Sequence, residues 1–369
     1  MQGSVLDRAS REWAARPDDE RFLSLEELAN AVSLRRGESW TLETAPQEMR
    51  TVIEDGRLGL KVYDGREGRE KYLEPTHWSF GQLASYAKAP ASYLRELPDQ
   101  LAAINLQWGL EHNPIRDNAL VLGRTNSETH LRSITSRSYG RIWDSQVVDA
   151  VQKANVNGNW QVPAASYTTS NPKRATTLYA SDRDVFIFLV DPDNAIEHGE
   201  DTLFRGFFAW NSEVGAATFG LATFLYRYVC DNRLVWGAQN VNELRIRHTK
   251  GAPDRFAYEG ARYLDSYAQA SAADTVRAID AAKRFEMDTE ERRKDKGGGW
   301  ESWLKSRGFT GAQAERAVKT AQAEQGEARS LWDIIQGITA SARSIAHTDE
   351  RIKLETQAGG LMRYAEAKA

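Results

Sequence analysis

Hydrophobic and polar positions change their spacing twice along the chain, and the changes predict three regions. In residues 1–117 the spacing is mainly helical, and Ser24 and Ser79 each stand where a capping residue begins a helix. Residues 118–252 carry short apolar or alternating runs between turn residues, which is typical of strands. Residues 253–369 return to helical spacing. We therefore expect an α+β fold: a curved, mostly antiparallel sheet with packed helices, and helical N-terminal and C-terminal parts.

Individual runs make this outline more specific. Asp184–Val190 is the clearest strand, and its unbroken apolar character predicts that both of its faces are covered. Leu203–Trp210 predicts a second strand, and Asp144 stands where a helix should begin. In the C-terminal region the charged stretch 288–296 predicts a solvated helix end. Gly297–Gly299 follows it and predicts a hinge before three further helices.

Composition and charge narrow the function classes. With a formal net charge of −4, the chain lacks a histone-like excess of positive charge, although a local basic strip could still bind nucleic acid. The single cysteine, Cys230, excludes an intrachain disulfide and agrees with a reducing compartment. The polar start has no apolar signal core, and no apolar run approaches the ~20 residues that span a bilayer. We expect a cytoplasmic protein without a membrane partner.

The motifs of common enzyme classes are missing from the sequence. It contains no Gly-x-x-x-x-Gly-Lys phosphate loop, no Gly-x-Ser-x-Gly elbow and no zinc-ligand spacing. Glu197, His198, Glu200 and Asp201 could hold a divalent ion in a metal enzyme such as a nuclease, but a solvated loop between two strands is the favoured interpretation. We therefore expect no enzymatic activity, no cofactor and no bound metal.

Two basic constellations could contact a polyanion. The first comprises Arg132, Arg137, Tyr139 and Arg141. The last three stand two residues apart, so an extended chain would place them on one face. Guanidinium groups with hydroxyls and a ring suit the phosphates and bases of a single strand, while pairing with local carboxylates is the equally weighted alternative. The second constellation comprises Arg245, Arg247, His248 and Lys250. Because Arg245 and Arg247 share a strand face and repel each other, an acidic strand or a phosphate backbone is expected beside them.

A third constellation is polar and suggests a structural corner. Asn211, Ser212 and Glu213 end a predicted strand, and such residues cap turns. Glu213 could pair with an arginine such as Arg227 and set the geometry of a site. Asn232 completes the set.

Six segments along the chain carry a family resemblance: Trp78–Leu83, Tyr93–Pro98, Leu131–Tyr139, Asn211–Gly215, Arg227–Asn232 and Arg247–His248. Taken in this order, they resemble the phage/plasmid-like family catalogued as domain of unknown function 932. The resemblance covers roughly Trp78 to His248 and leaves the C-terminal helices outside; it departs from the family where Arg233 replaces a glycine. It implies a mobile genetic element and a cytoplasmic protein, and it supplies no activity. The order of strands and helices is more loosely similar to that of phage single-strand annealing proteins, which form rings or filaments on DNA.

The leading hypothesis is single-stranded DNA binding and ATP-independent annealing in phage recombination or replication. It implies single-stranded DNA and further copies of the chain as partners, with a host or phage replication protein as another. Its expected DNA contacts are Arg132, Arg137, Tyr139, Arg141, Arg227, Arg245, Arg247, His248 and Lys250. The alternative is a protein-binding phage factor that inhibits or recruits a host enzyme, which the 11 Trp residues would suit.

Overall fold

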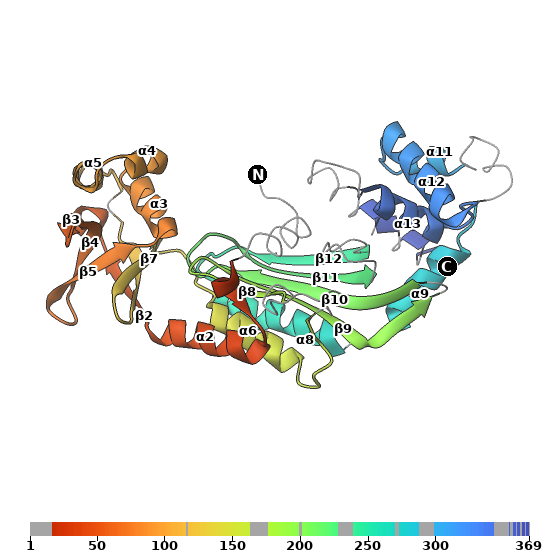
Figure 1. Ribbon diagram of the computed structural model, residues 1–369, viewed down its shortest axis with the longest axis horizontal. Helices are drawn as coiled ribbons and strands as arrows, with labels where there is room; N and C mark the ends of the chain where they lie inside the picture. Colours follow the sequence, from red (N-terminus) through yellow and green to blue (C-terminus); the bar gives the residue numbers. More distant parts are fainter. Residues whose placement is uncertain are drawn as a thin grey trace.

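The computed structural model describes most of the chain. The described residues are 17–115, 117–162, 176–198, 201–227, 239–269, 273–287 and 299–342, with 354, 357–358, 360–361, 364–365 and 367–368. Two six-stranded sheets and a C-terminal group of helices follow one another along the long axis of the molecule (Figure 1).

Sheet A is antiparallel throughout and has the order β1-β8-β9-β10-β11-β12. Its strands are β1 (Arg21–Phe22), β8 (Leu178–Ala180), β9 (Val185–His198), β10 (Asp201–Asn211), β11 (Phe219–Arg227) and β12 (Gln239–Ile246). Three helices lie along one face: α2 (Leu25–Gly37), α6 (Asp144–Ala154) and α8 (Ala261–Gln269) (Figure 1). The core on this face joins Val147 and Val151 of α6 to Ile187 and Leu221 of the sheet, so burial of apolar surface holds these helices in place.

Sheet B has the order β2-β6-β7-β5-β4-β3, with one parallel pair, β5 and β7. Its strands are β2 (Ser39–Thr44), β3 (Arg50–Glu54), β4 (Arg57–Asp64), β5 (Arg69–Pro75), β6 (Ala119–Thr125) and β7 (Thr129–Ser136). Its helices are α3 (His77–Tyr86), α4 (Ala91–Glu96) and α5 (Asp99–Glu111). Leu83 and Leu106 of these helices share a core with Leu60 and Val121 of the strands.

Short 3₁₀ turns and the C-terminal helices complete the fold. The turns are η1 (Asp18–Glu20) and η2 (Pro46–Glu48). After sheet A come α7 (Ala252–Arg255), the π-helical turn η4 (Phe256–Gly260), α9 (Ala273–Arg284), α11 (Trp300–Lys305), α12 (Gly311–Gln325) and α13 (Leu331–Ala342). Helices α9 and α11–α13 share a core of their own around Trp300 and Ile335. Among the described residues, no helix combines the length and the apolar character needed to cross a membrane.

The structure confirms the α+β class and several elements. Helix α6 begins at Asp144, and all of Val185–Val190 is buried, as the apolar run predicted. Gly299 caps α11 with φ +86°, a left-handed conformation that favours glycine, whereas Gly297, Gly298 and the charged stretch 288–296 lie outside the described residues.

The prediction of a mainly helical N-terminal region is wrong in part. Residues 1–117 also contribute five strands, β1 to β5. The β3–β4 hairpin turns at Asp55 and Gly56, both at positive φ (+48° and +78°), and an Asp-Gly pair is the strongest short hairpin signal. Strand β2 pairs with β6, about 80 residues further along the chain, so its pairing has no local signal.

Candidate functional site

The Glu213 carboxylate lies at the junction of the two sheets, between two guanidinium groups. Arg132 on β7 places Nη1 2.6 Å from Glu213 Oε1, and Arg35 on α2 places Nε 3.4 Å from the same oxygen. Both arginines and Glu213 are buried. Since α2 belongs to sheet A and β7 to sheet B, this one carboxylate links the two sheets electrostatically.

A second buried carboxyl, that of Asp144, adjoins the first. Arg35 Nη2 donates to Asp144 Oδ2 at 2.7 Å, and Asn211 Nδ2 donates to Asp144 Oδ1 at 2.7 Å. The backbone N–H of Asp144 donates to Glu213 Oε2 at 3.1 Å, so the start of α6 is tied to the motif at the end of β10. Asn211, Ser212 and Glu213 thus form the structural corner that their residue types predicted.

The two basic segments, more than 100 residues apart in the chain, meet at this corner. Gly140 N donates to His248 O at 3.1 Å, and His248 Nδ1 lies 3.0 Å from Gly140 O. The rings of Tyr139 and His248 stack with centroids 4.9 Å apart. Tyr139 Oη donates to Ser212 O at 2.8 Å, and Arg141 donates to Glu213 O. Segments 136–141, 211–215 and 247–250 therefore form one cluster. Together with Arg35, Arg132, Asp144 and the side chains of α3 that contact it, this cluster is called the junction.

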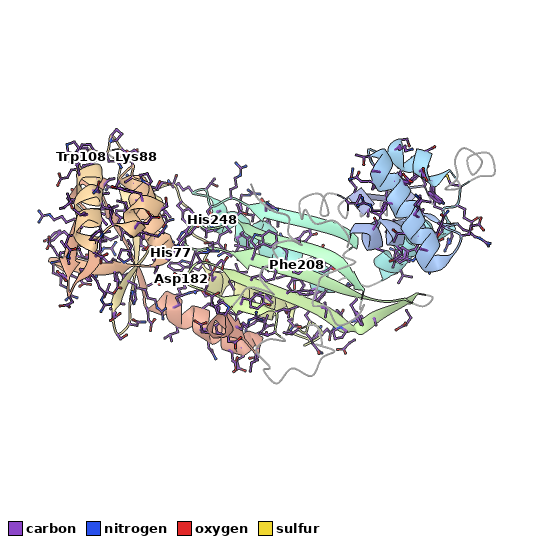
Figure 2. All side chains as sticks on the ribbon, turned by 45° about the horizontal axis from the view of Figure 1, so that its top comes forward. His77, Lys88, Trp108, Asp182, Phe208 and His248 are labelled. Atoms are coloured by element: carbon purple, nitrogen blue, oxygen red, sulfur yellow. The ribbon has the colours of Figure 1, made fainter. Side chains whose placement is uncertain are left out.

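Helix α3 of sheet B fixes the turn after Glu213. Trp78 Nε1 and Gln82 Nε2 both donate to Val214 O, at 3.0 and 2.8 Å. Gln82 Oε1 accepts from the backbone N–H of Ile134 at 3.0 Å, which ties the same helix to β7. The loop at Asp182 and Arg183 closes the corner, because Ser212 Oγ donates to Arg183 O at 2.6 Å. Figure 2 labels Asp182 and His248 in this part of the molecule, between the two sheets.

The buried charges change the proton affinities of the junction groups. Burial and the neighbouring Glu213 carboxylate raise the pKa of Asp144 to about 8, although Arg35 and Asn211 act the other way. Burial opposes ionisation of Glu213, but Arg132 and Arg35 outweigh it and hold the pKa of that carboxyl below its usual range. Burial lowers the pKa of the His248 imidazole, against the effect of the Gly140 carbonyl.

A comparison with protein families places most of the junction in one matched region. A family model described as Domain of unknown function (DUF932) matches residues 133–349, which is more than half of the 369 residues. The chain belongs to this family. No curated protein and no solved structure matches it significantly.

The extent of the DUF932 match corrects the expected one. The match includes α9 and α11–α13, which were expected to lie outside, and it begins within β7, after the Trp78 and Tyr93 segments. The junction therefore combines DUF932 residues such as Asp144 and Glu213 with residues that precede the match, among them Arg35, Trp78 and Arg132.

Two of the predicted DNA contacts, Arg132 and Arg141, point into the protein. The expectation that Arg132 faces a polyanion is wrong, because its side chain is only 2% exposed and pairs with Glu213. Arg141 is turned inward toward the Glu213 carbonyl and lies over the Tyr139 ring, so it too supports the corner. The prediction for Arg132 failed because both faces of β7 are covered from Leu131 to Thr135.

The remaining predicted cations stay at the surface. Arg137 is exposed and lies 3.3 Å from Glu43, and Arg245, Arg247 and Lys250 are exposed as well. Arg245 lies over the Trp210 ring on sheet A, 5.9 Å from its centroid. Tyr139 and His248 are half-buried and stack on each other. The Arg227 side chain and Asn232 lie outside the described residues.

The structure also bears on the expected ion pair of Glu213 and on the possible metal ligands between β9 and β10. The partners of Glu213 are Arg132 and Arg35, and nothing in the sequence near Glu213 points to either. Of the proposed metal ligands, Glu200 lies outside the described residues, and His198 pairs with Asp201 across the β9–β10 ladder. The side chains of His198 and Asp201 also lie outside the described residues.

Proposed function

We propose that this chain binds single-stranded DNA at the junction surface and anneals strands without a nucleotide, in phage recombination or replication in the host cytoplasm. The observation that supports the proposal is the hydrogen-bonded contact between Gly140 and His248, which brings the exposed cations of two distant segments to one place. Those cations are Arg137, Arg247 and Lys250, with Arg183 on the adjoining loop.

The surface cations suit this role better than the buried ones. Within the described part of the chain, Arg247 and Lys250 form no ion pair. The Arg137–Glu43 pair is solvent-exposed on both sides and is worth at most ~1 kcal/mol, so a phosphate could replace the carboxylate. The hydroxyls of Ser136 and Ser138 are exposed beside Arg137 and could donate to phosphate oxygens. In this proposal Arg132, Arg141 and Glu213 position the surface and do not touch the strand.

Binding to a labelled single-stranded oligonucleotide, measured by fluorescence anisotropy at several salt concentrations, tests the proposal. Each phosphate contact contributes about 0.7 to the log–log slope of affinity against salt. The double change Arg247→Ala/Lys250→Ala should therefore reduce the slope by about 1.4 and weaken binding at low salt.

The matched control is Arg66→Ala/Lys88→Ala, which removes two exposed cations that have no ion pair within the described residues. Lys88 lies between α3 and α4, beside the helices that pack on sheet B and apart from His248 in Figure 2. This control should leave both slope and affinity unchanged. A salt-independent signal, or equal losses in the two double variants, would reject a DNA site at the junction.

A protein contact is a further part of the proposal. Leu101, Ile104 and Trp108 form an exposed apolar stripe on α5, and Ile104 and Trp108 are 65% and 64% exposed. A ring or filament of identical subunits needs such a surface, and so does the alternative function, a phage factor that inhibits or recruits a host enzyme.

Mass measurement in solution separates these two uses. If the stripe joins copies of this chain, Ile104→Ser/Trp108→Ser should reduce the mass of the assembly and abolish annealing, while binding of a short oligonucleotide persists. A wild-type protein that is monomeric at all concentrations and binds no DNA would favour the protein-binding factor.

A further inference from the structure

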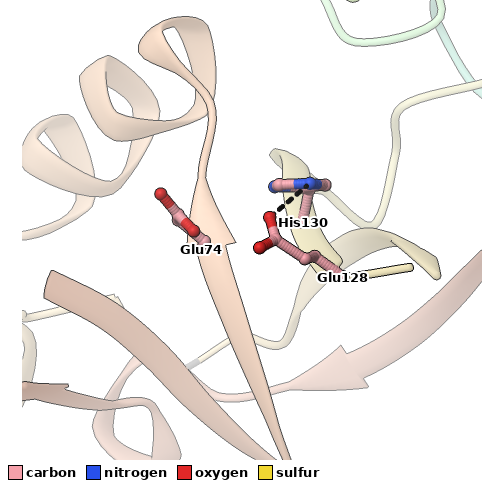
Figure 3. Close-up of side chains that lie close together, drawn as sticks. All are labelled: Glu74, Glu128 and His130. Carbon is pink, nitrogen blue, oxygen red and sulfur yellow. Dashed lines mark ion pairs between the residues drawn. The ribbon is translucent and has the colours of Figure 1, made fainter. Parts of the chain in front are cut away.

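Three potential metal ligands meet on sheet B. Glu74 is the residue before the last of β5, Glu128 lies in the β6–β7 hairpin, and His130 is the second residue of β7. The parallel ladder pairs Glu74 with His130, and Glu128 stands two residues before His130. One ligand atom from each lies within 4.8 Å of the other two (Figure 3). The pairing of β5 with β7 therefore brings Glu74 and His130 together, and the hairpin turn just before β7 adds Glu128.

We propose that Glu74, Glu128 and His130 bind a divalent transition-metal ion, with Zn²⁺ as the best match. One imidazole nitrogen and two carboxylate oxygens are typical zinc ligands, whereas Mg²⁺ and Ca²⁺ favour oxygen alone. Two ligands ~2.1 Å from a tetrahedral ion lie about 3.4 Å apart, so small side-chain rotations suffice. Each side chain is partly exposed, which leaves a coordination position for water.

Arg57 on β4 neutralises the same carboxylates when no ion is bound. Its Nη1 lies 2.7 Å from Glu74 Oε2, and its Nη2 lies 3.8 Å from Glu128 Oε1. These pairs are solvent-exposed and weak, so a divalent ion can displace the guanidinium. A cation and Arg57 therefore compete for the two carboxylates. Removing Arg57 should strengthen metal binding, which a purely structural salt-bridge cluster does not predict.

Titration of the full-length protein with Zn²⁺ by calorimetry, without DNA, tests this site. His130→Ala should weaken binding at least tenfold, and Arg57→Ala should tighten it several-fold. His112→Ala is the control, because His112 is another exposed histidine, at the end of α5, and its loss should change nothing. Affinity should also fall as the pH is lowered, because a proton competes with the metal for the imidazole.

A second measurement keeps the test decisive if a variant folds poorly. Zn²⁺ should raise the melting temperature of the wild type, and this shift should disappear in Glu128→Gln, which keeps the shape of the side chain. Zn²⁺ binding that survives both His130→Ala and Glu128→Gln, or that weakens in Arg57→Ala, would overturn the proposal. Because no DNA is present, such a failure leaves the DNA-binding proposal untouched.

Discussion

Arg132 and Arg137 lie five residues apart in the sequence but have opposite environments. The Arg132 guanidinium is enclosed with Glu213, and the Arg137 side chain is 62% exposed beside Glu43. Burying a charge is costly unless it is paired, so the loss of one partner from the enclosed pair leaves an uncompensated charge in a low dielectric. The same change at the surface only returns a carboxylate to water.

This contrast predicts different outcomes for two arginine substitutions. Arg132→Met should lower the free energy of unfolding by about 3–5 kcal/mol, measured by urea denaturation, because Glu213 loses its closest partner. Arg137→Ala should lower it by less than ~1 kcal/mol while weakening DNA binding. Similar stability losses in the two variants would contradict the proposal that Arg132 stabilises the fold and that Arg137 contacts the DNA.

The Asp144 carboxyl should make stability depend on pH. Its pKa in the folded protein is about 8, above the ~3.9 of an unfolded aspartate, so the folded state holds the proton more tightly. This contribution is complete below pH ~4 and is lost as the pH rises toward 8. From pH 5.5 to 8.5 the wild type should lose stability relative to Asp144→Asn, which carries no proton to release. Parallel curves for the two proteins would show that Asp144 is already ionised at neutral pH.

At the scale of elements, the sequence predicted those helices and strands that depend on residues close together in the chain. The apolar run in β9 and the helical spacing from Asp144 are legible in the sequence because burial acts on residues close together in the chain. Capping by Asp144 was not the reason, since Trp143 is the N-cap of α6 and the Asp144 side chain accepts from Arg35 and Asn211. The Asp55-Gly56 turn was an equally local signal for the β3–β4 hairpin. The pairing of β2 with β6, and the approach of Arg35 to Glu213, depend on contacts across 80 to 180 residues. The three constellations were therefore recognisable, while their meeting, and which arginines became buried, were not.

At Gly140 two segments that are distant in the sequence lie in close contact. A Cβ built on Gly140 would lie 1.9 Å from the Thr249 carbonyl oxygen, a backbone atom that cannot move aside cheaply. Gly140→Ala should therefore push segment 247–250 away, lower the melting temperature by several degrees and weaken DNA binding. Gly65→Ala is the control, since no atom lies within 4 Å of its Cβ position. Unchanged DNA affinity in a folded Gly140→Ala variant would show that the contact between the two segments is not needed for DNA binding.

At the scale of the whole molecule, most of the buried hydrophobic residues in the described part of the chain fall into three cores. The cores of sheets A and B meet at the Glu213 junction through polar groups, whereas the C-terminal core is built from residues 276–365 alone among those described. The DUF932 match runs through sheet A and most of the C-terminal core, but it includes little of sheet B. The family's shared unit thus spans two cores, and sheet B reaches it mainly through Arg132, Trp78 and Gln82.

A separate core predicts separate unfolding of the C-terminal helices. Ile335 in the C-terminal core and Ile187 in sheet A are both fully buried, so an alanine at either position should cost about 2–5 kcal/mol. If the C-terminal helices form their own cooperative unit, Ile335→Ala should lower only one of two thermal transitions and expose these helices to limited proteolysis. DNA binding at the junction should persist, because none of its contacts involves that core. Ile187→Ala should lower the other transition and weaken binding, because β9 leads into the sheet that carries the corner at Glu213. If both variants instead shift a single transition by the same amount, the three cores unfold together, and the C-terminal helices must be counted as part of the binding domain.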